Sequence, residues 1–154
     1  MYPSANCLSK FAIGVILGAA LSANAWAEDA KPRSLFERLG GEPAVRAVVG
    51  DFVDRLLKDT RVNRWFAQAA ADPARLAAYK GKLGDMVCQA AGGPCQYAGM
   101  DMMAAHRGRA VTDEAFAATV ENLTATLDKF KVPEAEKSQL IALLAPLKPA
   151  IVQK

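Results

Sequence analysis

Histidine is scarce in this chain, because it occurs once, at His106. A single imidazole excludes the histidine pairs and clusters of many metal centres, and any chemistry that needs an imidazole must use this residue. Cysteine is also rare, and the spacing of its three residues matches no zinc motif. No stretch shows the strict alternation of apolar and polar residues that marks a half-buried strand, so we predict no sheet.

The first 27 residues differ from the rest of the chain. Lys10 is their one charged side chain, an apolar run extends from Phe11 to about Ala23, and small residues then lead to Ala25-Trp26-Ala27. This order is typical of a secretory signal peptide that is cleaved after Ala27. The apolar run is shorter than the roughly 20 residues that span a membrane, although an uncleaved signal anchor is the alternative.

Cleavage would leave residues 28–154, which is enough chain for one domain with a hydrophobic core. We therefore expect an exported, periplasmic protein with no integral membrane association after cleavage. The signal removes Lys10 and no acid, so the formal net charge falls by one from +3, and the remaining charges are scattered. Such a small net charge, spread along the chain, predicts no binding to nucleic acid.

Apolar residues recur at helical spacing through the rest of the chain. The clearest case runs from Val45 to Leu57, where they repeat every three or four positions and form a wide stripe. Ser34 and Thr112 are candidate N-caps of two further helices. The expected helices lie near residues 35–39, 43–57, 73–90, 101–106, 112–130 and 133–151.

Glycine and proline mark where these helices end. Gly40-Gly41 stops the first, and Gly92-Gly93-Pro94 ends the helix that Asp72-Pro73 opens. Pro146 and Pro149 fall inside the last apolar pattern and should kink or fray it. We predict a single all-α domain.

The surroundings of His106 leave two interpretations open. Met102 lies four residues earlier and shares a helical face with it, and Met103 flanks that face. A half-buried core histidine bonded to a backbone carbonyl fits this pattern, and so does a metal ligand, because a neutral imidazole is the commonest protein ligand for metals. The methionines alone do not decide, since methionine is often core filler.

The order of the segments resembles a group I truncated haemoglobin from about Leu35 to Val152. Each motif is weak alone, and their order and spacing together are specific. The motifs are Leu39-Gly40-Gly41, Ala91-Gly92-Gly93-Pro94, Asp101-Met102-x-x-x-His106, Thr112-x-x-x-Phe116 and Leu143-Leu144-Ala145-Pro146-Leu147-x-Pro149. The resemblance implies a truncated globin domain at 28–154, a two-over-two helical sandwich around haem b.

The resemblance also implies roles for individual residues. His106 matches the proximal histidine that coordinates haem iron, in a five-coordinate or weakly six-coordinate site that binds a diatomic gas such as oxygen or nitric oxide. Lys82 and Arg109 match basic positions that pair with the haem propionates. The implied haem contacts are Phe52, Phe66, Lys82, Met102, His106, Arg109 and Phe116.

The distal side departs from the usual pattern of that family, in which a tyrosine and a glutamine hydrogen-bond the bound gas. The matching positions here are Val53 and Leu83, and neither side chain can donate a hydrogen bond. Tyr79 lies one turn before Leu83 and is the one obvious donor, although its hydroxyl fits a position in water equally well. We therefore expect a weakened hold on oxygen, since a hydrogen bond to a charged acceptor is worth roughly 1.5–3 kcal/mol.

Cys88 and Cys95 flank the glycine turn, and they are the two cysteines that remain after cleavage. Gly92-Gly93 lets the chain reverse there, so we predict that the two thiols can form a disulfide in an oxidising compartment. Such a bridge would hold the loop that leads to His106. The alternative is a buried Cys88 beside a free Cys95.

Other functions compete with gas binding. Met100, Met102, Met103 and His106 lie within seven residues, and thioether and imidazole ligands suit copper(I), so an exported copper-binding protein is one alternative. A helical interaction module without a ligand is another. Nitric-oxide or peroxidase-like haem chemistry is compatible with the sequence, which does not identify a turnover reaction or a redox partner.

Overall fold

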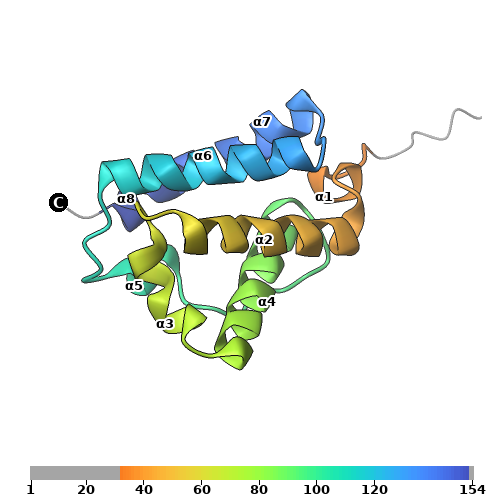
Figure 1. Cartoon of the computed structure of the whole chain (residues 1–154). Helices are drawn as coiled ribbons and strands as arrows, with labels where there is room; N and C mark the ends of the chain where they lie inside the picture. The colour runs from red at the N-terminus through yellow and green to blue at the C-terminus, as the bar shows by residue number, and fades with distance from the viewer. Residues whose placement is uncertain (1–31, 153–154) are drawn as a thin grey trace, which may run out of the picture. The chain divides into compact units, whose positions relative to one another are not determined.

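The computed structural model describes residues 32–152, and every regular element within that range is a helix (Figure 1). The signal peptide predicted at residues 1–27 lies outside the described residues. The α-helices are α1 (Leu35–Arg38), α2 (Gly41–Lys58), α3 (Ala67–Ala70), α4 (Pro73–Ala90), α5 (Met102–His106), α6 (Asp113–Lys129), α7 (Glu134–Ala142) and α8 (Lys148–Ile151). Two 3₁₀ turns, η1 (Asn63–Phe66) and η2 (Ala145–Leu147), interrupt the series.

The helices begin at the caps that the sequence predicts. The Ser34 hydroxyl accepts a hydrogen bond from the Glu37 amide, and the Glu37 carboxylate accepts one from the Ser34 amide at 2.8 Å, which completes a capping box. The Thr112 hydroxyl accepts from the Ala115 amide at the start of α6. These bonds satisfy amides that a helix leaves unpaired in its first turn, so the predicted starts of α1 and α6 are confirmed.

Helix α2 is central, because it packs against both α4 and α6 (Figure 1). One core cluster joins α2 to α6 and α7, and its buried members are Phe52, Leu56, Val62, Val111, Ala115, Ala118, Leu123, Leu127 and Leu140. A second cluster joins α1 and α2 to the end of α4, and its members are Phe36, Val45, Val49, Val53, Cys88 and Ala91. The predicted all-α domain is therefore confirmed for the described residues.

The end of the chain differs from the single helix predicted at residues 133–151. It consists of α7, η2 and α8, and Pro146 and Pro149 stand in the first turns of the last two. Proline has no amide hydrogen and clashes with the preceding turn, so the chain restarts instead of only kinking. Leu143, predicted on the buried side, is 36% exposed at the end of α7. Among the described helices, none is long and apolar enough to cross a membrane.

Candidate functional site

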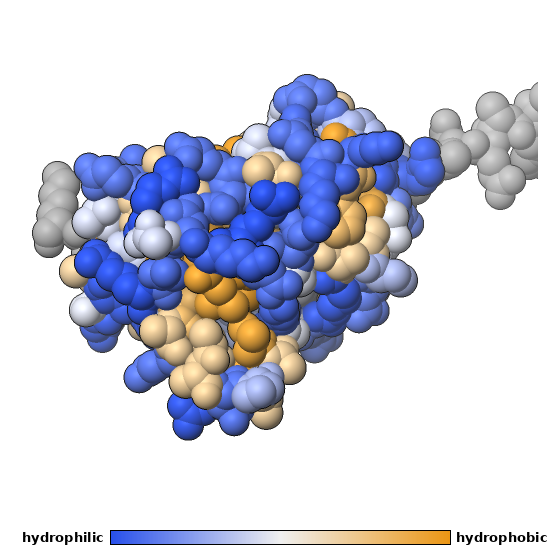
Figure 2. All heavy atoms as spheres, viewed as in Figure 1, coloured by the Kyte–Doolittle hydropathy of each residue, from blue (hydrophilic) through white to orange (hydrophobic). Residues whose placement is uncertain are grey.

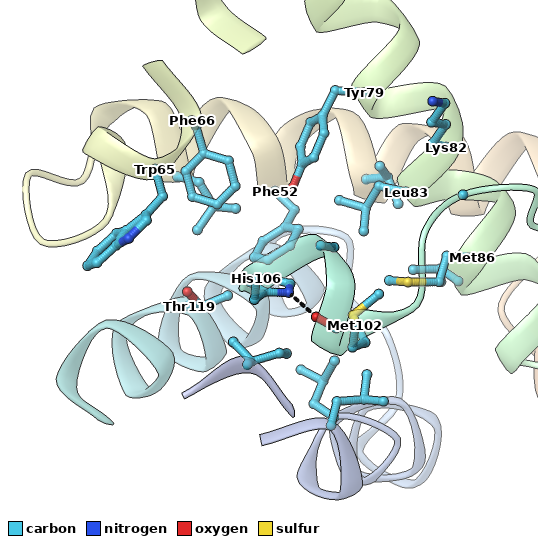
Figure 3. A pocket seen from close by; sticks show the side chains of 18 of the residues that line it. Phe52, Trp65, Phe66, Tyr79, Lys82, Leu83, Met86, Met102, His106 and Thr119 are labelled. Atoms are coloured by element: carbon cyan, nitrogen blue, oxygen red, sulfur yellow. Dashed lines mark hydrogen bonds between the residues drawn. The ribbon is translucent and has the colours of Figure 1, made fainter. Parts of the chain in front are cut away.

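A cavity of about 630 Å³ opens beside α5 and is bounded by α2, α4, α6 and the C-terminal segment (Figure 3). This volume falls within the roughly 300–1,000 Å³ typical of small-molecule sites. Its walls are mainly apolar. Large apolar residues on the walls include Phe52, Leu56, Trp65, Phe66, Leu83, Met86, Met102, Phe116, Leu123, Leu140, Leu144, Leu147 and Ile151.

His106 is the last residue of α5 and lines the cavity. The helix starts at Asp101, whose carboxylate accepts a hydrogen bond from the Ala104 amide at 2.9 Å. At the other end, Nδ1 of His106 lies 2.8 Å from the Met102 carbonyl oxygen (Figure 3). A carbonyl only accepts, so Nδ1 carries the proton, and Nε2 of the neutral ring keeps its lone pair for a metal ion.

Tyr79 enters the cavity from α4, opposite His106, and its ring points toward Phe52 (Figure 3). The ring packs edge-on against Phe66, with centroids 5.8 Å apart. Burial raises the pKa of Tyr79 to about 12, and the nearby positive charge of Arg109 opposes the shift only in part. The hydroxyl is therefore protonated at neutral pH, and it makes no hydrogen bond within the described part of the chain.

Cations line the cavity and carboxylates do not. Arg75, Lys82 and Arg109 all contribute to its walls, and the lining residues include no aspartate or glutamate. None of these three cations forms an ion pair with another described residue, although the Arg109 guanidinium donates to the Ala105 carbonyl at 2.7 Å. A bound molecule with carboxylates at one edge would meet available positive charge here.

The cavity brings together the seven residues predicted to contact haem, namely Phe52, Phe66, Lys82, Met102, His106, Arg109 and Phe116. Two of the three residues predicted for the distal pocket, Tyr79 and Leu83, also line it. The third, Val53, is not among the lining residues, so its role in the distal pocket stays a prediction. Val53 is fully buried in the second core cluster, because adjacent helical residues point about 100° apart and Phe52 takes the cavity side.

Several lining residues were not predicted. The Trp65 indole donates a hydrogen bond to the Arg109 carbonyl at 2.7 Å, and Arg64 covers its ring. Tyr97 and Thr119 also line the cavity. The adjacent pair Trp65-Phe66 was visible in the sequence, but an aperiodic loop gives no signal of which way Tyr97 points.

The methionine cluster that suggested copper is only partly brought together. Met100 and Met102 line the cavity with His106, whereas the side chain of Met103 is 58% exposed and is not among the lining residues. Among the described residues, no group of three or more histidine, cysteine, aspartate and glutamate side chains could hold a metal ion. Among side chains of these four types, His106 is the one that lines the cavity.

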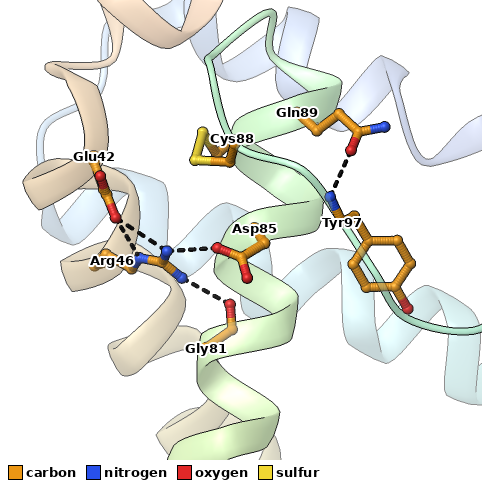
Figure 4. Close-up of a disulfide and its surroundings, with 8 residues drawn as sticks. Glu42, Arg46, Gly81, Asp85, Cys88, Gln89 and Tyr97 are labelled. Atoms are coloured by element: carbon orange, nitrogen blue, oxygen red, sulfur yellow. Dashed lines mark hydrogen bonds and ion pairs between the residues drawn. A yellow bond between two sulfur atoms is a disulfide. The ribbon is translucent and has the colours of Figure 1, made fainter.

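Cys88 and Cys95 form a disulfide at the end of α4, with their Cα atoms 5.8 Å apart (Figure 4). The chain reverses between them at Gly92, whose φ of +81° is a conformation that glycine adopts without strain. A Cβ on Gly93 would lie 2.6 Å from Sγ of Cys88 and 2.7 Å from the Phe36 ring, so this turn admits no side chain at that position.

The fold and the cavity define the class of protein: a short helical bundle around a large apolar cavity that is lined by one histidine and three cationic side chains. This is a globin architecture. The chain belongs to the bacterial-like globin family, whose profile matches residues 34–153.

Relatives within this family are group 1 truncated haemoglobins. The protein from Mycolicibacterium paratuberculosis is 34% identical over 122 residues, which cover 79% of this chain and 86% of that protein. The protein from Tetrahymena pyriformis is 35% identical over 105 residues, covering 68% and 83% of the two chains.

Solved structures agree with the sequence comparison. The iron(III) form of the Tetrahymena pyriformis truncated haemoglobin matches with a TM-score of 0.71 at 29% identity, over 79% of this chain and 100% of that one. The 2/2 haemoglobin of a Synechococcus species, solved in the cyanomet state with covalently attached haem, matches with a TM-score of 0.71 at 30% identity and the same coverage. The predicted two-over-two fold is confirmed.

Proposed function

We propose that this globin binds haem b in the cavity, with His106 as the proximal ligand, and reversibly binds a diatomic gas such as oxygen or nitric oxide. The observation that carries the proposal is the bond from Nδ1 of His106 to the Met102 carbonyl. It fixes the tautomer and the ring orientation, and it leaves Nε2 available for iron.

The cavity fits haem in its chemistry as well as its volume. Its apolar walls suit the porphyrin face, and Lys82 and Arg109 suit the propionates. When bound, haem would supply an iron that binds a diatomic gas, and Nε2 of His106 would hold that iron. His106 is the one histidine of the chain, so no second imidazole would compete with the gas.

The partner of His106 favours reversible binding over peroxide chemistry. Its Nδ1–H donates to a neutral carbonyl and not to a carboxylate, so the ring stays a neutral imidazole with moderate electron donation. Strong donation from an anionic proximal ligand is what promotes cleavage of an oxygen–oxygen bond. We therefore propose gas binding as the main activity.

Haem titration of the purified protein tests the proposed function. We expect a Soret band that saturates at one haem per chain, and His106→Gly should lose the histidine-ligated spectrum and regain it when free imidazole is added. Met103→Leu is the matched control, because Met103 lies on the same helix but is exposed. Copper uptake without a Soret band would support the copper alternative, and unchanged axial ligation in His106→Gly would reject the role of His106.

Tyr79 is the proposed donor to the bound gas. Its protonated hydroxyl points into the cavity opposite His106, and the other distal residue, Leu83, cannot donate. Tyr79→Phe should raise the oxygen dissociation rate roughly tenfold, because a hydrogen bond to a charged acceptor is worth at least about 1.5 kcal/mol. Stopped-flow displacement of oxygen measures this rate.

Thr119→Val is the control for that experiment. Thr119 lines the same cavity, but its hydroxyl donates to the Ala115 carbonyl at 2.8 Å and is not available to a bound gas. An oxygen dissociation rate that is the same in Tyr79→Phe and the parent would remove Tyr79 from the binding site.

We further propose that the protein is exported to the periplasm after cleavage following Ala27. The n-region, apolar run and Ala25-Trp26-Ala27 support this, and a disulfide between Cys88 and Cys95 suits an oxidising compartment. Fractionation of a Gram-negative host and intact-mass measurement test the proposal. A protein that stays in the cytoplasm with residues 1–27 attached would contradict it.

A further inference from the structure

Helix α5, which carries His106, has only five residues. A helix of this length is unstable alone, because nucleation costs more than so few hydrogen bonds return. The position of His106 therefore depends on what holds the two ends of α5. Its downstream end is held by the indole of Trp65, which donates to the Arg109 carbonyl at 2.7 Å.

The upstream end is held from α4 at two points (Figure 4). Cys88 is joined to Cys95 by the disulfide, and the side-chain oxygen of the next residue, Gln89, accepts a hydrogen bond from the Tyr97 amide at 2.6 Å. Two neighbouring residues in the last turn of α4 thus bind two positions of one loop. A loop held at two points can neither slide nor rotate freely.

Tyr97 connects these two anchors, the Cys88–Cys95 disulfide and the hydrogen bond to Gln89, to the start of α5. Its hydroxyl donates to the Met100 carbonyl at 2.9 Å, and its ring packs over Gly99 so closely that a Cβ there would force the ring to move. Met100 immediately precedes Asp101, the N-cap of α5. A shift of the loop therefore changes where α5 begins and where His106 points.

The anchors also link the two faces of the cavity. Helix α4 carries Tyr79 and Leu83 on one side, and the loop that it holds leads to His106 on the other. The distance between the distal and proximal side chains then depends on the end of α4, and not only on packing around α5.

We propose that the Cys88–Cys95 disulfide and the Gln89 side chain are positioning groups that place His106 for haem. This proposal rests on the proposed haem function. Neither group lines the cavity, so each acts through the loop and α5. Loss of an outer partner of a metal ligand typically weakens metal binding by about 10- to 100-fold.

The test uses the full haem-loaded chain in three altered forms. The first is the parent with its disulfide reduced by a phosphine, which should free two more thiols, those of Cys88 and Cys95. The second is Gln89→Leu, which removes the acceptor, and the third is Gln89→Glu, which keeps one. Gln96→Leu is the matched control, because Gln96 lies in the same loop, is exposed, and makes no hydrogen bond within the described residues.

Two readouts are measured: the rate of haem transfer to an excess of a scavenging apoprotein, and the iron–histidine stretching band of the ferrous form by resonance Raman spectroscopy. We expect reduction and Gln89→Leu each to raise the transfer rate by roughly 10-fold and to shift or broaden the band. Gln89→Glu should restore both values, and Gln96→Leu should leave both unchanged.

An unchanged transfer rate and band in the reduced protein and in Gln89→Leu would overturn the proposal. Faster transfer with an unchanged band would overturn it too, because the anchors would then act on the cavity wall and not on His106. A parent protein that takes up no haem would reject the proposed function itself, and this result is distinguishable from the other two.

Discussion

His106 and Tyr79 face each other across the cavity, and they differ in whether their N–H or O–H proton already makes a hydrogen bond. The Nδ1 proton of His106 is committed to the Met102 carbonyl, so the ring offers a lone pair. The Tyr79 hydroxyl makes no hydrogen bond within the described residues, so it offers a proton. One side of the cavity would therefore hold the iron of a bound haem through His106, and the other would offer a hydrogen bond from Tyr79 to a bound gas.

Thr126 is a residue whose polar group has no compensating partner. It is fully buried in α6, and its hydroxyl is the buried side-chain oxygen without a hydrogen bond among the described residues. Thr126→Val keeps the shape and removes the unsatisfied hydroxyl, so we expect the free energy of unfolding to rise by about 1 kcal/mol. Urea denaturation measures this difference.

Thr124→Val provides the comparison within the same helix. The Thr124 hydroxyl donates to the Val120 carbonyl at 2.9 Å, so its removal should bring no comparable gain. Equal effects of the two substitutions would show that the Thr126 hydroxyl does find a partner, for example a water molecule.

At the scale of elements, Asp51 links α2 to α6. Its carboxylate accepts from the Lys129 ammonium on α6 and from the Arg55 guanidinium one turn along α2. These two hydrogen bonds, that of Lys129 first, lower the pKa of Asp51 from 3.8 to about 2. The folded state therefore binds this proton less readily than the unfolded state does.

Because the folded pKa of Asp51 is depressed, its stabilising contribution is complete above about pH 4 and is lost as the pH falls toward 2. We expect the contribution to be roughly 1 kcal/mol, since the exposed Lys129 is screened by solvent. Asp51→Asn should therefore be less stable than the parent at pH 5, and this difference should shrink at pH 2.5. Urea denaturation at both pH values checks this, with Asp54→Asn as a half-exposed control on α2.

The helices of the structure show which features of the fold could be predicted from the sequence. Caps and stop signals such as Ser34 and Gly92-Gly93-Pro94 act locally, so the helix starts and the turn at the end of α4 were predictable. The place of His106 beside the cavity was predictable from motif order. The burial of Val53 away from the cavity lining was not, because motif spacing gives a position but does not say which way a helix rotates.

Long-range polar contacts were beyond sequence reasoning for a different reason. Arg46 on α2 donates to the Gly81 carbonyl at 2.7 Å and pairs with Asp85 on α4, and Gly84 leaves room for its guanidinium (Figure 4). These partners are 35 or more residues away, and many other exposed acids were available to Arg46. Only the packing of α2 on α4 selects among them.

At the scale of the whole molecule, the two core clusters relate differently to the cavity. Most buried members of the first cluster line it, including Phe52, Leu56 and Leu140. Most members of the second, such as Phe36 and Cys88, do not. The hydropathy-coloured view in Figure 2 shows apolar surface between charged side chains on one face of the molecule. Part of the apolar surface of this fold therefore faces the cavity, and part is buried against other parts of the chain.

This division predicts how the molecule responds to removal of haem. In hydrogen–deuterium exchange, haem loading should protect α5 and α8 most, because both depend on the first cluster and the cavity. It should change α1 and the end of α4 least, because the second cluster and the disulfide hold them without a ligand. Loading should also raise the unfolding free energy, by about 2.7 kcal/mol at a hundredfold excess of free haem over Kd. A uniform change in protection along residues 32–152 would contradict this division, because it would mean that the second cluster depends on haem as much as the first.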